Sequence, residues 1–173
     1  MHSRPLVHAV RRGVNLLSKV TETVAALLLW MIFIVLLGEL LSRNLLSRSL
    51  AGSWELAAFM MAVMFFLGLA PALLAGSHVR VTMLSHLLVG RVAKIVEASI
   101  LTVALVVSSY AATALVNLAL RSFQRGSLSW ELSVPLVLPQ AFVALGMALL
   151  AFTFAAKLFL LLFDDSVLPA EKT

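Results

Sequence analysis

The chain has 173 residues, of which 62% are hydrophobic and 12% are charged, with no cysteine and a formal net charge of +5. Its mean hydropathy of +1.06 is far above that of a soluble domain, so most of the chain must face lipid or other helices. The lack of cysteine excludes disulfide frameworks, zinc ribbons, iron–sulfur clusters and thiol catalysis. No nucleic-acid partner is expected, because the basic residues lie dispersed between apolar runs.

Four stretches lack Asp, Glu, Lys and Arg over most of the roughly 20 residues that a helix needs to cross a bilayer. The sequence therefore predicts an all-α integral membrane protein with four transmembrane helices in one membrane domain, 1–173. A polar tail follows the last span at 164–173. The expected spans are approximately 21–41, 55–76, 97–120 and 134–160.

Two shorter segments are predicted to lie at the membrane surface as amphipathic helices. In the first, approximately 5–19, apolar residues recur at helical spacing while basic residues occupy other faces, which favours contact with anionic lipids of the inner leaflet. A frayed basic tail is the alternative for this segment. The second, approximately 80–91, places Leu84, Leu87 and Leu88 along one side of a short helix.

The distribution of basic residues predicts the topology. Lys and Arg number nine on the side of the two termini and the central loop, and four on the side of the other two loops. Because cytoplasmic loops carry the excess of positive charge, the N- and C-termini are expected in the cytoplasm. The loops around 43–53 and 121–131 are then expected outside.

Few ionisable groups fall within the predicted spans. Glu39 and Arg43 are four residues apart, so a continuous helix would pair them at the outer end of the first span. Glu55 begins the second span at a similar depth and is a candidate third member. Two interpretations stay open: a cluster that fixes the hairpin or meets a partner, and an ordinary interfacial pair that ends a helix.

The tetrapeptide Ser-Trp-Glu-Leu occurs twice, at 53–56 and at 129–132, each time after an outer loop with arginine. This recurrence raises the hypothesis of two hairpins related as an internal repeat. Trp54 and Trp130 flank the outer loops, where an indole gains from lying at headgroup level.

The third span carries a polar stripe, in which Ser109, Thr113 and Asn117 recur at intervals of four. One interpretation is a polar path through the membrane. The other, which we favour, is interhelical hydrogen bonding worth roughly 1 kcal/mol or less per contact.

Small residues form rows that allow helices to approach closely. One row contains Gly68, Ala72 and Gly76 in the second span, and a shorter one contains Ala144 and Ala148 in the fourth. We interpret both as packing features.

The sequence contains no pattern of a catalytic or cofactor site. The four histidines lie in the N-terminal segment and the central loop, so none is placed for axial ligation of a haem within a span. No nucleophile elbow, Walker loop or zinc-protease helix occurs either. We therefore expect neither enzyme activity nor a bound cofactor or metal.

Three segments in and after the second span, at 53–57, 66–70 and 76–81, resemble the hallmark of the small, Q-type membrane subunits of tripartite ATP-independent periplasmic (TRAP) transporters. Thr82 departs from that pattern, because the family often has Asp there, and so does Leu74, near which an Arg is common. The positions that match are Trp54, Glu55, Gly68, Gly76 and His78.

The resemblance implies a noncatalytic subunit in the bacterial inner membrane, in contact with lipid and with two protein partners. A large multi-span transport subunit would pack against it, and it would help dock a periplasmic substrate-binding protein for sodium-coupled uptake of a carboxylate-bearing solute. Alternatives are a self-sufficient homodimeric transporter and a membrane anchor of a redox enzyme. The candidate structural or subunit-interface residues are Glu39, Arg43, Trp54, Glu55, Gly68, Ala72, Gly76, His78 and Arg80.

Overall fold

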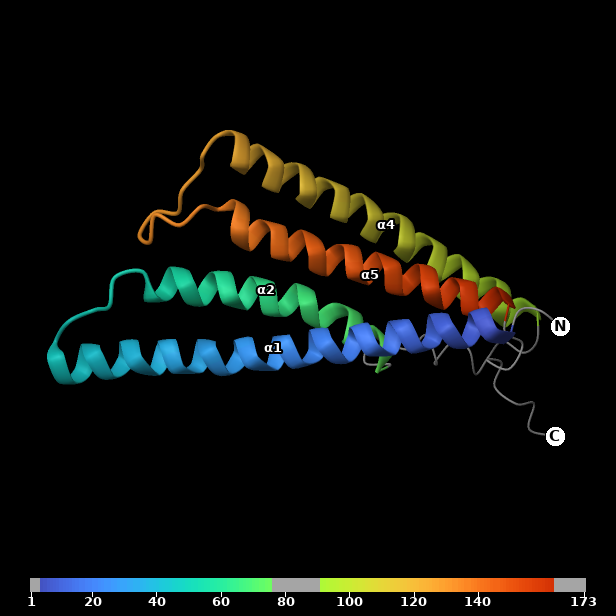
Figure 1. Cartoon of the computed structure of the whole chain (residues 1–173), viewed down its shortest axis with the longest axis horizontal. Coiled ribbons are helices and arrows are strands. Elements are labelled where there is room, and N and C mark those ends of the chain that lie inside the picture. The colour runs from blue at the N-terminus through green and yellow to red at the C-terminus, as the bar shows by residue number, and fades with distance from the viewer. Residues whose placement is uncertain (1–3, 76–90, 164–173) are drawn as a thin grey trace.

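The computed structural model describes residues 4–75 and 91–163, and its fold is all-helical (Figure 1). Each of its four long helices is long and apolar enough to cross a membrane, which confirms the predicted fold class. Hydrocarbon offers no hydrogen-bond partners, so an apolar segment satisfies its backbone groups by forming a helix. The helices are α1 (Arg4–Leu46), α2 (Ser53–Leu74), α4 (Arg91–Gln124) and α5 (Val137–Phe163).

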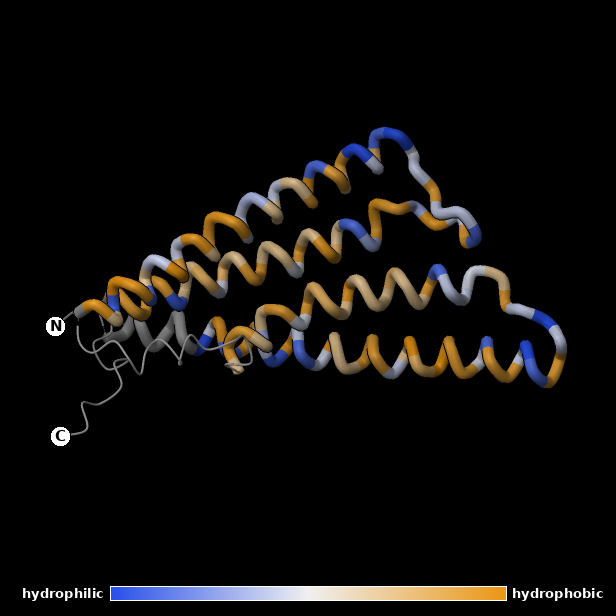
Figure 2. The backbone as a smooth tube through the Cα atoms, turned by 180° about the vertical axis from the view of Figure 1, so that it is seen from behind, coloured by the Kyte–Doolittle hydropathy of each residue, from blue (hydrophilic) through white to orange (hydrophobic). Residues whose placement is uncertain are grey.

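The helices lie side by side in the spatial order α1, α2, α5, α4, as Figure 1 shows. The two central helices, α2 and α5, pack on each other, while α1 packs mainly on α2 and the extensive contacts of α4 are with α5. We call the end that carries the connections 47–52 and 125–136 the loop end, and the opposite end, with the start of α1 and the end of α5, the terminal end. Figure 2 shows polar residues gathered in the loops and apolar residues along the helices.

The core is thin, because a layer of helices encloses less volume than a closed bundle. Between α1 and α2 it is formed by Ile32, Ala57 and Met60, with partly buried neighbours such as Met64. In the most apolar 18-residue window, 28% of residues are buried in each central helix and 11% in α1 and α4. Most of the apolar surface of the chain thus faces outward.

The N-terminal segment differs from the prediction. Residues 5–19 do not form a helix separate from the first span but continue directly into it, which gives a single α1 of 43 residues. The physical reason is that the stretch around Lys19–Thr23 contains no proline or glycine to interrupt the helix. The predicted interfacial segment 80–91 and the polar tail 164–173 lie outside the described residues, apart from Arg91, which begins α4.

Candidate functional site

At the loop end, Glu39 fixes the connection between α1 and α2. Its side chain is almost fully buried, with 3% exposure. It accepts hydrogen bonds from the Ser49 hydroxyl at 2.6 Å, the Leu50 backbone N–H at 2.7 Å and the Ser53 hydroxyl at 3.0 Å. Because these donors flank the start of α2, one carboxylate holds the turn and the beginning of the next helix against the end of α1.

Glu55, in the first turn of α2, reaches the other hairpin. Its carboxylate accepts three backbone hydrogen bonds, from the N–H groups of Trp130 at 2.9 Å, Glu131 at 3.0 Å and Leu132 at 2.9 Å. Charge-assisted bonds of this kind are stronger than those between neutral groups. One side chain of α2 therefore fixes the turn that precedes α5.

Glu131, which lies in that turn, binds the start of α2 in its turn. Its carboxylate accepts a hydrogen bond at 2.9 Å from the backbone N–H of Gly52, the residue before α2. Gly52 has φ of +78°, and a Cβ on it would overlap the Leu132 side chain, so glycine suits this position for two reasons. We call the reciprocal bonds of Glu55 and Glu131 the carboxylate clasp.

The turn held by the clasp has a defined backbone of its own. Leu128 and Pro135 form an antiparallel bridge, and the backbone of Ser129 donates a hydrogen bond to the carbonyl oxygen of Val134 at 2.9 Å. The Ser129 hydroxyl accepts a further bond from the Val134 N–H at 3.1 Å. The clasp and these bonds together present Trp130, which is 94% exposed, at the tip of the turn.

The exposed surface of the loop end is rich in arginine. Glu39 and Glu55 direct their carboxylates to hydrogen-bond donors of the chain, whereas the Arg43 side chain is 60% exposed and approaches Glu39 only at 3.9 Å. Arg48, Arg121 and Arg125 are exposed as well. The arrangement turns the carboxylates of Glu39 and Glu55 toward the chain and leaves guanidinium groups outward.

The structure brings together some of the predicted site residues. Glu39 and Arg43 are paired, as their spacing predicts. Glu55 does not join them, because its three backbone bonds lie across the layer. Trp54, beside the connection 47–52, is 59% exposed.

Gly68 and Ala72 lie in the half of α2 nearer the terminal end. Within the described residues, no heavy atom outside the helix lies within 4 Å of a Cβ built on Gly68, and Ala72 is half-buried. The close approach of α2 and α5 occurs instead at Gly146, where a Cβ would lie 2.6 Å from the backbone carbon of Phe66. Gly76, His78 and Arg80 lie outside the described residues.

Sequence reasoning missed the partners of the clasp, although the repeated tetrapeptide marked both of its carboxylates. The two copies adopt different conformations, since Ser53–Leu56 is helical and the stretch 129–132 forms a turn. The recurrence is therefore not a repeated local structure. Its two glutamates are instead the acceptors that join the two hairpins.

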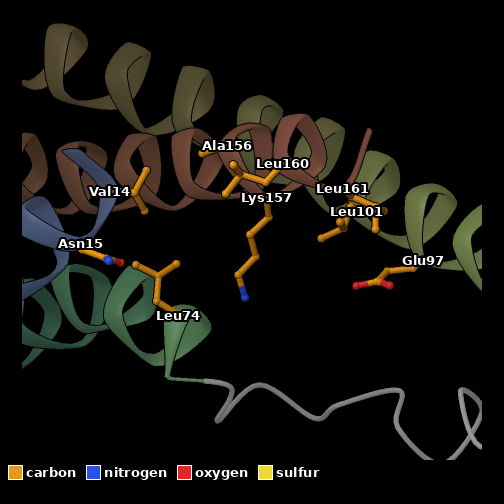
Figure 3. Close-up of a pocket in the computed structure, with 9 residues that line it drawn as sticks. All are labelled: Val14, Asn15, Leu74, Glu97, Leu101, Ala156, Lys157, Leu160 and Leu161. Atoms are coloured by element: carbon orange, nitrogen blue, oxygen red, sulfur yellow. The ribbon is translucent and has the colours of Figure 1, made fainter. Parts of the chain in front are cut away.

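At the terminal end, the four helices surround a cavity of about 260 Å³ (Figure 3). Lys157 of α5 crosses it and donates a hydrogen bond at 2.6 Å to the carbonyl oxygen of Leu73 in the last turn of α2. An ammonium group suits this position, because a helix C-terminus carries unsatisfied carbonyls and partial negative charge. The cavity is lined by Val14, Asn15, Leu74, Glu97, Leu101, Ala156, Lys157, Leu160 and Leu161.

The fold is that of a small multi-pass membrane protein. The glutamates of its loop end form hydrogen bonds that hold its own loops and helix starts in place. The family model of the tripartite ATP-independent periplasmic transporters, DctQ component, matches residues 32–164, well over half of the chain. The chain therefore belongs to the DctQ family, a noncatalytic membrane component of TRAP transporters in the inner membrane. Neither the curated proteins nor the solved structures gave a match.

Proposed function

We propose that the chain is the scaffold of its transporter. It packs against the large multi-span transport subunit in the membrane and helps dock the substrate-binding protein outside. In this proposal the large subunit transports a carboxylate-bearing solute together with sodium ions, and the small subunit transports neither the solute nor the ions. The proposed topology has the terminal end in the cytoplasm and the loop end outside, in keeping with the nine basic residues against four.

The observation that carries the proposal is the open face of α2. Trp54, Ala58, Met61 and Phe65 recur at helical spacing and are all exposed. The face continues at Gly68, where a Cβ has open space. A membrane helix that exposes a small residue beside bulky ones offers a groove for another helix, because helix association in lipid depends on close backbone approach.

Co-purification tests the proposal directly. The tagged chain is co-expressed with the large membrane subunit and the substrate-binding protein, extracted in mild detergent and purified by its tag. We expect the large subunit to be retained, and solute uptake in liposomes to require all three proteins and a sodium gradient. Solute flux through liposomes that hold this chain alone would contradict the proposal and favour a self-sufficient transporter.

Gly68→Leu sharpens the test, because it adds bulk to the open face at a position where an added Cβ meets no neighbour among the described residues. We expect an unchanged yield of the chain and a clear loss of co-purified large subunit. Gly13→Leu is the matched control, since Gly13 also has open space but lies outside the segment that matches the family. Equal recovery of the large subunit from both variants would argue against the α2 face.

A further inference from the structure

The two outer edges of the helix layer differ in chemistry. α1 forms one edge, and the side of α1 turned away from α2 is apolar at membrane depth, with exposed Leu27, Trp30 and Ile34. α4 forms the other edge. The side of α4 opposite its buried Ser108 and Ala112 carries polar groups.

The polar groups on the α4 edge come from Tyr110, Thr113 and Asn117, all of which are exposed. Thr113 satisfies its hydroxyl within its own helix, by donating a bond at 2.8 Å to the Tyr110 carbonyl oxygen. Within the part of the chain that the structure describes, the Tyr110 hydroxyl and the Asn117 amide make no hydrogen bond. Thr113 and Asn117 belong to the predicted polar stripe, and neither makes an interhelical hydrogen bond within the described residues.

Of these groups, the Tyr110 hydroxyl has the greatest need of a hydrogen-bond partner, because Tyr110 lies near the middle of the predicted span. It lies near the middle of the uncharged stretch 98–120, about 15 Å or more along the helix from either end, and its side chain is 77% exposed. Tyrosines of membrane proteins gather at the interfaces, where the hydroxyl meets water or headgroups. A hydroxyl at mid-depth facing lipid tails has no partner, and an unpaired polar group in hydrocarbon is costly.

We infer that the α4 edge, through Tyr110 and Asn117, is an interface with a transmembrane helix of the large transport subunit that offers hydrogen-bonding groups at these two depths. The inference rests on the proposed scaffold function, which supplies a membrane-embedded partner. Lipid tails cannot pair with a hydroxyl or an amide, whereas helices of a multi-span transporter contain both donors and acceptors. The apolar α1 edge faces lipid in the same assembly.

Photocrosslinking in the complete complex tests which edge meets the partner. A p-benzoylphenylalanine residue replaces Tyr110 on the α4 edge or, as the matched control, Ile34 on the α1 edge, where the side chain is 63% exposed. We expect irradiation to join position 110 to the large subunit and position 34 to lipid only. A crosslink from position 34, a product between two copies of this chain at position 110, or no product at 110 from an intact complex would each overturn the inference.

Conservative substitutions test the hydrogen bonds themselves. Tyr110→Phe and Asn117→Leu remove polar groups with little change in bulk, and each should weaken retention of the large subunit roughly threefold, the amount expected for one interhelical hydrogen bond in a membrane. Trp30→Phe on the α1 edge is the control and should leave retention unchanged. If the unaltered chain failed to retain the large subunit, the scaffold function itself would be refuted. Unchanged retention of the large subunit by both α4 variants would refute only the α4 interface.

Discussion

The loop end and the middle of the helix layer are held together by different forces. At the loop end, Glu39 and the clasp glutamates accept seven hydrogen bonds from loops and helix starts. In the middle, the α2 and α5 backbones approach directly at Gly146, where no polar side chain takes part. The comparison shows that packing sets the distance between the hairpins, while hydrogen bonds set how their loops are presented.

The largest effect is expected where packing alone holds the helices. Gly146→Ala adds a single Cβ that would lie 2.6–2.9 Å from the backbone of Phe66 and Leu67, so the helices must separate, at a cost of about 1–3 kcal/mol. Thermal unfolding in detergent, followed by tryptophan fluorescence, measures the loss. Gly68→Ala is the matched control, because its Cβ meets open space and should leave Tm unchanged or slightly higher. Equal Tm values for the two variants would show that the close approach does not hold the layer.

The next effect is expected at the clasp. Glu55→Ala leaves the N–H groups of residues 130–132 without their acceptor, so we expect a fall in Tm of several degrees and faster amide exchange confined to this turn. Hydrogen exchange followed by mass spectrometry measures the second effect. Glu131→Ala frees only the Gly52 N–H and should therefore shift exchange at the start of α2 instead. Unaltered exchange at 130–132 in Glu55→Ala would disprove the clasp.

A smaller effect is expected from Glu39→Gln. The amide keeps one acceptor oxygen, but it loses the charge that strengthens the bonds from Ser49, Leu50 and Ser53. Tm should fall less than in Glu55→Ala, and the Leu50 amide should exchange faster. Glu22→Gln on the exposed surface of α1 serves as the control and should change neither quantity.

The smallest effect is expected at the terminal end. Lys157→Met keeps most of the length of the side chain but removes the donor to the Leu73 carbonyl oxygen. We expect a small fall in Tm and faster exchange in the last turn of α2, where the Ala75 N–H bonds to Pro71. A variant in which exchange rises at 130–132 instead would show that the two ends are coupled rather than independent.

Several features were predictable from sequence because they depend on local spacing. The four spans follow from the length of the uncharged stretches, and the Glu39–Arg43 pair follows from its spacing of four on one helix. The continuation of the first helix through Glu39 to about residue 41 was predicted as well, and the structure extends it to Leu46.

The remaining features depend on tertiary placement, which spacing does not encode. Glu55 bonds to residues 75–77 positions away, and the choice of those partners requires the two hairpins to lie side by side. The small-residue pattern drew attention to Ala144 and Ala148, whereas the contact is at Gly146, because the direction of α2 decides which side of α5 is approached. The order of the helices in the layer is likewise set by contacts between distant segments.

The length of α1 gives the helix a mechanical property. At 43 residues it is about 65 Å long, roughly twice the thickness of the hydrocarbon core, and it runs without interruption from Arg4. With the span beginning near residue 21, as the sequence predicts, the roughly 23 Å before Lys19 would act as a lever: a tilt of about 10° within the membrane would displace its far end by about 4 Å. Small changes of membrane thickness around the transporter would thus be amplified at the basic N-terminus.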